Sequence, residues 1–575
     1  MKLNSKYQAY RCSLVAVSLL AMLLCPMGLR SAGAGPLPDV RVPNIGSTMQ
    51  EAQTVRPTPA PEQENPDIVK KNGQAAPEDQ GGPTLFVREF KLENVEYLSE
   101  AEIQKVLEPF KGRNLTMGQL EQATRAVTDL YRKKGYTVAK AYLPKQTAAD
   151  GILIIRIVIG SYSAPTSEND SLVRDWLVNK SLKSNLPEGK PVRRSDLERA
   201  VLTIADMPGA AMPTLNIGPG QTPGTTEVFT QVPKGKRFGG YVISDDMGSR
   251  YTGRFRFGAG VDVNSPLGLA DKLSLFGLIT DTAGLYNFGV NYGFPLSPNG
   301  LRLTLGYART KYQLGDSFED LDATGTADVY QATLTYPLLR TSSQNLYLSL
   351  NGAHKEMEDR YNSFDYTKRD YSTLGKFGVV HERWGTLFGK PLFTRLGGYV
   401  TCGDFHFPSA SERAQDYRDT DGFFGYGNLE FLSVLALTEK WSLSVSGSGQ
   451  KAFGKNLDSS EQFVVTGARG VKAYRETVSG DNGYLINAEL KYKLPTIVKW
   501  DHYLGGFVDQ GGWSYEKSPF PSPSVGDMTD IGLGYYVNYG LFSGKVQLVQ
   551  GLGAYPVGLK KESQTSVCAS VMLSF

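Results

Sequence analysis

The chain has 575 residues, which is too long for one ordinary hydrophobic core, so we expect two or three domains. Its 61 basic and 58 acidic residues give a net charge of +3, which provides no electrostatic reason to expect nucleic acid as a partner. Glycine (63), tyrosine (31) and phenylalanine (26) are abundant, while the mean hydropathy is slightly negative. This composition argues against a bundle of apolar transmembrane helices and suits a transmembrane β-barrel with aromatic girdles.

Residues 1–34 have the layout of a secretory signal peptide. Basic residues precede an apolar run from Leu14 to Leu24, which is short for a membrane span, and small residues at 32–34 offer a cleavage site. Cys25 follows the bulky Leu24, which argues against an acylated lipoprotein N-terminus. We therefore expect export from the cytoplasm.

Residues 35–82 are rich in Pro, Gln and Glu and have little periodicity, which predicts a disordered linker. Within this linker, a short helix near residues 46–54 is a candidate, with Ser47 as its cap.

Residues 83–162 predict a compact α+β domain in the order strand, helix, helix, strand, strand. Ser99 with Glu102, and Thr116 with Gln119, have the spacing of capping boxes at two helix starts. An Asp-Gly pair at 150–151 predicts a hairpin turn into the apolar strand 152–159.

Residues 163–235 predict a second domain of the same order. Its first helix is expected to carry Leu172, Trp176 and Leu177, and its second helix to be capped by Ser195. The two domains differ in sequence but share an architecture, which suggests a tandem pair.

From residue 236 to the end, segments of about ten residues alternate between apolar and polar side chains, which is typical of membrane-spanning strands. The last segment alternates from Val567 to the C-terminal aromatic residue Phe575. At roughly 20 residues per strand and turn, the 339 residues from Arg237 onward allow about 16 antiparallel strands, and these must close because an open edge in lipid leaves backbone groups unpaired.

A soluble β-sandwich or propeller is the alternative reading of this alternation. The export signal, the C-terminal aromatic residue and the unequal loops argue against it. The long, charged loops are expected at 316–327, 356–373 and 404–420.

No catalytic, cofactor or metal site is predicted. HExxH, GxSxG, P-loop and GxGxxG motifs are missing from the sequence. Cys402 and Cys568 do not form a CxxC pair, and we expect them to be unpaired residues packed on strands. The scattered histidines are His354, His381, His406 and His502. We expect a protein that is not an enzyme.

Two segments of the barrel region have an unusual composition. Residues 467–483 place cationic side chains among small residues, and residues 507–511 place Phe507, Asp509 and Gly511 on one face of a strand. If that face is the lumen, Lys472 could contact both Asp509 and Phe507 and tie a folded-in loop to the wall. A surface loop with solvated charges is the alternative.

The chain resembles the TpsB transporters of two-partner secretion (the ShlB/FhaC/HecB family of haemolysin secretion and activation proteins), whose two periplasmic domains are POTRA domains. The stretches that carry the resemblance are 130–136, 143–146, 196–199, 207–209, 223–226 and 245–254. The resemblance implies a transmembrane antiparallel β-barrel of about 16 strands (236–575), preceded by two α+β POTRA domains (83–162 and 163–235).

The family has a Val-Arg-Gly-Tyr or Val-Arg-Ala-Tyr tetrad on a loop inside the barrel, whose arginine meets the aspartate of a Phe-x-Asp-x-Gly strand. Here residues 471–474 read Val-Lys-Ala-Tyr, ending at Tyr474, while the strand motif is intact. Lysine keeps the charge but lacks the planar fork of arginine, so Arg469 or Arg475 could share the contact. The family often has a helix that plugs the pore, and residues 46–54 match its place.

The resemblance implies an outer-membrane translocator that captures an unfolded TpsA-like exoprotein with its POTRA domains and passes it through the barrel. Further expected partners are outer-membrane lipid and, through the terminal Phe575, the barrel-assembly machinery. The cargo could be a haemolysin, an adhesin, a contact-dependent toxin or a haem-binding protein. An outer-membrane assembly factor and a passive porin or adhesin are the rival functions.

Overall fold

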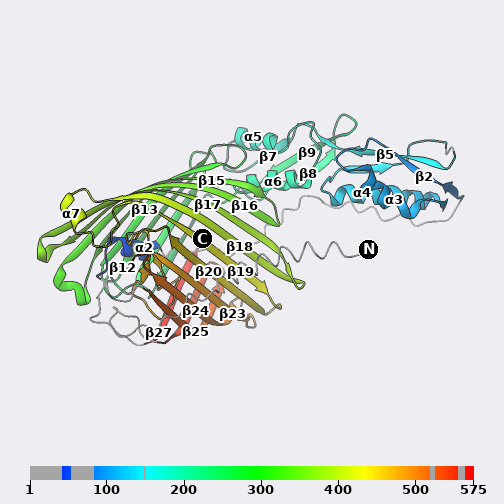
Figure 1. The fold of residues 1–575 in the computed structure, drawn as a ribbon. Helices are drawn as coiled ribbons and strands as arrows, with labels where there is room; N and C mark the ends of the chain where they lie inside the picture. Colours follow the sequence, from blue (N-terminus) through cyan, green and yellow to red (C-terminus); the bar gives the residue numbers. More distant parts are fainter. Residues whose placement is uncertain (1–41, 54–82, 148–149, 518–524, 554–563) are drawn as a thin grey trace.

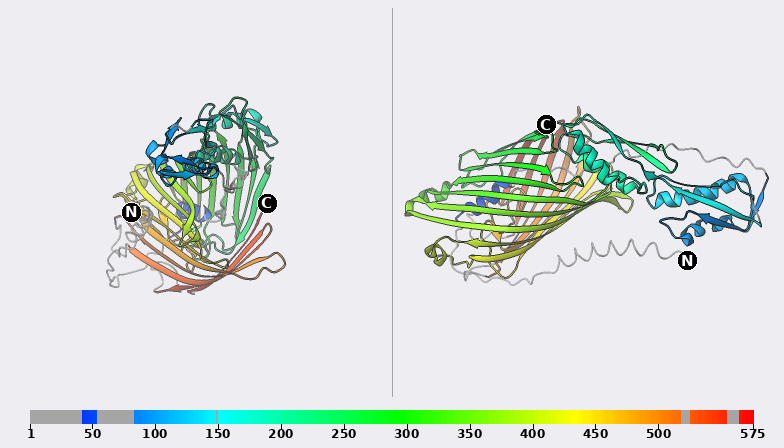
Figure 2. Two further views of the ribbon diagram at one scale, coloured as in Figure 1. Left: turned by 90° about the vertical axis from the view of Figure 1, so that its right-hand side faces the viewer. Right: turned by 90° about the horizontal axis from the view of Figure 1, so that it is seen from above.

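The computed structural model describes residues 42–53, 83–147, 150–517, 525–553 and 564–575. It consists of two small α+β domains, followed by a barrel that holds a short helix in its interior (Figures 1 and 2). The first domain lies at the far end of the molecule, and the second lies between it and the barrel (Figure 1). None of the helices in the described residues is both long enough and apolar enough to cross a membrane.

The first α+β domain has the predicted order and caps. Its elements are β1 (Leu85–Val87), β2 (Glu89–Glu93), α3 (Glu100–Leu107), η1 (Glu108–Phe110), β3 (Arg113–Leu115), α4 (Met117–Lys133), β4 (Ala139–Tyr142) and β5 (Ile152–Ile159). Both predicted capping boxes are confirmed, with Ser99 at the start of α3 and Thr116 at the start of α4. The Asp150–Gly151 turn is also confirmed, since both residues have positive φ, as a type I′ turn requires.

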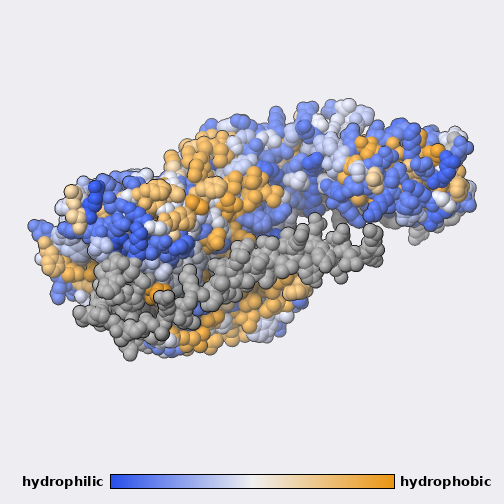
Figure 3. Space-filling view, viewed as in Figure 1, coloured by the Kyte–Doolittle hydropathy of each residue, from blue (hydrophilic) through white to orange (hydrophobic). Residues whose placement is uncertain are grey.

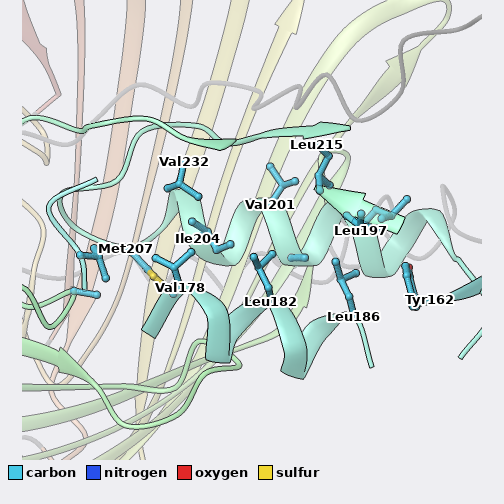
Figure 4. Packing of buried hydrophobic residues seen from close by; sticks show 14 of the residues in the cluster. Tyr162, Val178, Leu182, Leu186, Leu197, Val201, Ile204, Met207, Leu215 and Val232 are labelled. Carbon is cyan, nitrogen blue, oxygen red and sulfur yellow. The ribbon is translucent and has the colours of Figure 1, made fainter. Parts of the chain in front are cut away.

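The second α+β domain is built around the facing helices α5 and α6. Its elements are β6 (Ser161–Tyr162), β7 (Thr166–Asn169), α5 (Asp175–Asn185), α6 (Arg194–Ala205), β8 (Thr214–Pro219) and β9 (Thr225–Val232). Leu182 of α5 and Val201 and Ile204 of α6 are fully buried between the helices and the sheet (Figure 4). Apolar residues spaced along one face of each helix account for this packing.

Two predictions for the second domain are wrong. Ser195 does not cap α6, because the helix already begins at Arg194 and its cap, Arg193, makes no side-chain capping bond. Leu172 precedes α5, whereas Trp176 and Leu177 lie on the helix as predicted. Trp176 is on the exposed side, with 53% of its surface accessible, and Val178 and Leu182 occupy the inward positions.

The two α+β domains share one strand-pairing pattern. In the first, β2 is parallel and β4 antiparallel to β5; in the second, β7 is parallel and β8 antiparallel to β9. Backbone hydrogen bonds join the domains, from Arg194 N to Gly135 O at 2.9 Å and from Thr137 N to Val192 O at 3.2 Å. These bonds restrict the angle between the domains because backbone groups cannot move independently of their elements.

The barrel is closed by antiparallel pairing of its first and last strands. Within the described residues it has 16 strands, which agrees with the predicted number. The strands are β10 (Phe238–Asp245), β11 (Arg256–Asn264), β12 (Lys272–Thr280), β13 (Leu285–Pro295), β14 (Arg302–Gln313), β15 (Ala323–Arg340), β16 (Gln344–Tyr361), β17 (Tyr366–Leu387), β18 (Lys390–His406), β19 (Gly422–Ala436), β20 (Trp441–Ala452), β23 (Asn482–Lys493), β24 (Asp501–Ser514), β25 (Val525–Tyr539), β26 (Phe542–Leu552) and β27 (Thr565–Ser574). At the closure, Tyr241 of β10 pairs with Ser574 of β27.

The strands show an apolar outer face, as their alternation predicts. Val567 and Val571 of β27 are 49% and 45% exposed, whereas Cys568 between them is fully buried on the inner face. On the face of the barrel seen in Figure 3, apolar surface covers much of the wall, and hydrophilic surface lies beyond it. This arrangement suits a wall that faces lipid outside and protein and water inside.

Of the three long charged loops predicted, only the segment 356–373 is mostly strand, because β16 runs to Tyr361 and β17 begins at Tyr366. The segment 316–327 is outside the strands up to the start of β15 at Ala323, and residues 407–420 lie between β18 and β19. Opposite charges face each other across β16 and β17, as between Arg369 Nε and Glu358 Oε2 at 2.7 Å. Such cross-strand pairs let a sheet continue into water beyond the membrane. The segment 404–420 contains the short helix α7 (Ala410–Ala414), and η2 (Asp316–Leu321) and η3 (Asn362–Phe364) form other turns.

The second α+β domain is fastened to the near end of the barrel by an ion pair whose arginine is buried and whose aspartate is partly exposed. Arg340, at the end of β15, donates two hydrogen bonds of 2.9 and 2.8 Å to Asp206, which follows α6. The Arg340 side chain is only 6% exposed, and it also donates to Asn345. A charge held this far from water is costly to leave without its partner.

We expect Asp206→Ala to loosen the second domain from the barrel, because Arg340 would remain buried without its carboxylate at a cost of roughly 3 kcal/mol. The distribution of distances between a spin label on α6 and one on the barrel, measured by double electron–electron resonance, should broaden. Glu188→Ala, which removes an exposed charge from the same domain, is the control. Equal distance distributions in both variants would contradict a fastening role for the pair.

Candidate functional site inside the barrel

The segment 453–481, between β20 and β23, folds back into the barrel. It contains the short antiparallel pair β21 (Phe463–Val464) and β22 (Ser479–Gly480). Val465, Val471 and Tyr474 pack in one buried cluster with residues of the barrel wall. The apolar residues among the glycines of this segment therefore anchor it inside, and the alternative of a solvated surface loop is wrong.

Lys472 of this folded-in loop lies on Asp509 of β24. Its ammonium group donates a hydrogen bond to Asp509 Oδ2 and lies 4.7 Å from the centre of the Phe507 ring. The Asp509 side chain is 1% exposed and that of Lys472 is 13% exposed. The neighbouring Val508 is 41% exposed on the outer face, so the Phe-x-Asp-x-Gly residues face the lumen. This is a desolvated, charge-assisted contact with a cation–π flank.

Two further side chains complete this contact. Asn487 of β23 donates to Asp509 Oδ1 at 2.6 Å, which fixes the second carboxylate oxygen. Asp530 of β25, directly paired with Asp509, accepts a 2.7 Å hydrogen bond from the Ala473 N–H. Sequence reasoning missed both, because their approach to the loop depends on the register of three strands.

Close packing at Tyr474 and Gly511 fixes the loop against the barrel wall. The Tyr474 side chain is 1% exposed and lies against Gly551, where an added Cβ would come within 3.0 Å of the tyrosine oxygen. At Gly511 an added Cβ would lie 3.2 Å from Val465 and 3.3 Å from Val471. The glycine of the strand motif therefore leaves space for the loop.

The alternative cations lie elsewhere. Arg475 donates to the backbone oxygen and carboxylate of Asp246, at 3.0 and 3.3 Å, and to Val567 O at 2.7 Å. It thus ties the loop to β27 and to the segment after β10. Arg469 is exposed and interacts electrostatically with Glu430 and Arg256. Of Arg469, Lys472 and Arg475, it is Lys472 that contacts Asp509.

The helix α2 (Ile45–Gln53) lies inside the barrel. Its cap is Asn44 rather than the predicted Ser47, because Asn44 Oδ1 accepts the Ser47 N–H at 3.0 Å. The Ile45 N–H donates to Asp359 on the barrel wall at 2.9 Å. Gln50 donates to two backbone oxygens of the folded-in loop, at 2.8 and 3.0 Å. The helix therefore contacts both the wall and the loop.

A polar cluster joins α2, the folded-in loop and the segment after β10. The Ser249 N–H donates to Glu51 of the helix at 2.9 Å, and its hydroxyl donates to Glu476 of the loop at 2.6 Å. Arg256 donates to the Glu51 backbone oxygen at 3.4 Å while forming a buried two-point ion pair with Asp245. Burial raises the pKa of the Glu51 carboxyl to about 7.

The C-terminal Phe575 lies where the barrel closes. Its backbone exchanges two 3.0 Å hydrogen bonds with Gly240, one residue beyond the pairing of β10 with β27. Its side chain is 49% exposed. The terminal aromatic residue thus extends the closing seam.

Family profiles match most of the part of the chain that the structure describes. A ShlB-type POTRA domain matches residues 85–160, which are the first α+β domain. Haemolysin secretion/activation protein ShlB/FhaC/HecB matches residues 224–527, more than half of the chain. The segment 161–223 between them is matched by neither of these profiles.

Relatives and solved structures agree with these profiles. The heme/hemopexin transporter protein HuxB of Haemophilus influenzae is 26% identical over 443 residues, covering 76% of this chain and 77% of HuxB. The outer membrane transporter CdiB of Escherichia coli is 23% identical over 464 residues, covering 77% of this chain and 75% of CdiB. The structure of CdiB from Escherichia coli superposes with a TM-score of 0.70 at 20% identity, covering 92% of this chain and 96% of CdiB. The chain therefore belongs to the haemolysin secretion/activation protein ShlB/FhaC/HecB family, the outer-membrane translocators of two-partner secretion.

Proposed function

We propose that the protein exports a TpsA-like exoprotein of the haemolysin or adhesin type as an extended chain through the lumen of its 16-stranded barrel. The single observation that carries this proposal is the juxtaposition of a periplasmic ShlB-type POTRA domain with a closed barrel whose interior holds a short helix and a folded-in loop. The family profile, which describes secretion/activation proteins, supports a role in transport. HuxB is named as a heme/hemopexin transporter, and we leave a haem-related cargo as one candidate among several.

We propose that the second α+β domain is a second POTRA domain. The support is its pairing pattern: β7 is parallel and β8 antiparallel to β9, as β2 is parallel and β4 antiparallel to β5 in the first domain. β2 and β7 each lie at a sheet edge, where an extended partner chain could add as a further strand. Backbone hydrogen bonds of this kind tolerate many partner sequences.

We propose that α2 acts as a plug and that Lys472 and Asp509 act as a lock. The plug is held by hydrogen bonds at both ends, to Asp359 and to Ser249, while the lock is a single buried charge pair. Passage of a partner requires both to move from the lumen. We also propose that Phe575 serves the barrel-assembly machinery as a recognition signal, since its half-exposed ring ends the last strand.

Removal of residues 83–160 is expected to abolish export while the barrel still inserts, because the partner loses its binding edge. The measurement is the amount of an adjacent-gene exoprotein in the medium of cells that express parent or deleted protein. Levels of unrelated outer-membrane proteins serve as the control. Unchanged export would contradict the proposal, and loss of those unrelated proteins would favour an assembly factor instead.

A further inference from the structure

One face of α5 carries an exposed tryptophan and two exposed lysines. Trp176, Lys180 and Lys183 are spaced by four and three residues, which places them on the same side of the helix. Trp176 is 53% exposed, and both lysines are exposed. Within the described part of the chain, none of the three side chains makes a hydrogen bond or an ion pair. The opposite side of α5 packs into the domain through Val178 and Leu182.

This face adjoins the rim of the barrel. The Arg174 N–H, at the start of α5, donates to Gly268 O in the turn between β11 and β12 at 2.9 Å. Further along α5, the Ser181 hydroxyl donates to Pro298 O in the turn between β13 and β14 at 3.0 Å. The helix therefore lies along two turns of the rim, and its exposed stripe borders the side that contacts them.

α5 lies on the outer side of the rim rather than over the lumen. The segment after α6, residues 205–210, lines a cavity together with the inward-facing Lys272 and Arg302 of the barrel, so α6 ends at the lumen mouth. In Figure 1, α5 lies above α6 and farther from the barrel interior. The stripe on α5 is thus on the side where the bilayer surrounds the wall.

The turns beneath α5 carry exposed apolar side chains. Leu267 in the first turn is 57% exposed, and Leu296 beside the second turn is 50% exposed. Because both turns follow directly on strands with an apolar outer face, we infer that the hydrocarbon boundary lies close to α5. An exposed apolar surface continuous with a lipid-facing wall is most stable in lipid.

We propose that the stripe formed by Trp176, Lys180 and Lys183 is a membrane-docking surface that rests on phospholipid headgroups of the periplasmic leaflet. Tryptophan partitions to the headgroup level because its ring is apolar and its N–H is polar. Lysines beside it reach phosphate groups through their flexible stems. Together with the Asp206–Arg340 pair, this contact orients the second domain, so that the first domain projects away from the membrane. The inference goes beyond the export function and does not depend on the lock or the plug.

The test uses the full-length protein in liposomes of phosphatidylcholine with phosphatidylglycerol. The native cysteines are replaced by serine, Lys180 is changed to cysteine, and an environment-sensitive fluorophore is attached there. A matched fluorophore at Lys133→Cys, on the exposed side of α4 in the distant first domain, is the control. Lipids with a nitroxide on the headgroup should strongly quench the fluorophore at position 180 and leave that at 133 nearly unchanged. Equal, weak quenching at both positions would overturn the proposal.

A second variant tests the stripe itself. Adding Trp176→Ser and Lys183→Gln to the position-180 reporter should reduce the quenching, and leaving out phosphatidylglycerol should reduce it in the unchanged stripe. Circular dichroism and the position-133 reporter check that the domain remains folded. If neither the substitutions nor the omission of phosphatidylglycerol alters the quenching, the assignment of these residues to a membrane-docking surface is overturned. Weak quenching at position 180 that is accompanied by shielding on addition of the exported partner would identify a protein-binding surface instead.

Discussion

An Asp509→Ala variant is expected to insert into the outer membrane and to lose export of the partner. The Lys472 side chain is only 13% exposed. The substitution removes the Asp509 carboxylate with which its ammonium group is paired. Removing one partner of a buried ion pair costs roughly 3–5 kcal/mol, which shifts the equilibrium away from the folded-in loop by more than about a hundredfold. Export into the medium, normalised to the amount of heat-modifiable barrel in the outer membrane, is the measurement.

Two matched variants distinguish the lock from a general loss of lumen charge. Lys491→Gln removes the cation of a nearby pair on β23, Lys491–Glu489 at 2.9 Å, and should retain export because that pair does not involve the loop. Lys472→Arg should also retain export, since it restores the planar fork without loss of charge. Export by Asp509→Ala at the parent level would show that the contact is structural and that transport proceeds without it.

Most of the fold could be predicted because it depends on local pattern. The capping boxes at Ser99 and Thr116 and the turn at Asp150–Gly151 are set by residues within a few positions of each other. Alternation with period two likewise gives the outer face of each strand and, from the available length, the strand number. The outer loop expected at 356–373 was predicted wrongly, because its charged residues are paired across β16 and β17.

The lumen site could be predicted only in part. The spacing within residues 507–511 shows which side chains share a face, and the resemblance to a known family pairs that face with Lys472. The partners Asn487 and Asp530 depend on the registers of β23 and β25 against β24, which no local pattern encodes. The same holds for Ser249, whose contacts to Glu51 and Glu476 join segments about 200 residues apart or more in sequence.

Gly46→Leu is expected to open the channel by preventing α2 from seating. A Cβ at position 46 would lie 2.3 Å from Ser459 Oγ and 2.6 Å from Ser460 N of the folded-in loop, and the longer leucine side chain would extend the collision. Leucine also favours the helix over glycine by about 0.8 kcal/mol, so an effect on the channel could not come from a weaker helix. The measurement is conductance in planar bilayers, where the variant should resemble a protein that lacks residues 42–53.

Gln53→Leu is the matched control for this experiment. Position 53 is exposed at the end of the same helix, so an identical side chain there has room and should leave conductance at the parent level. Because α2 contacts the loop through Gln50, displacing it should also raise the protease sensitivity of the segment 453–481. A closed Gly46→Leu channel would contradict the expected displacement of α2 and would mean that the loop adapts to the added side chain.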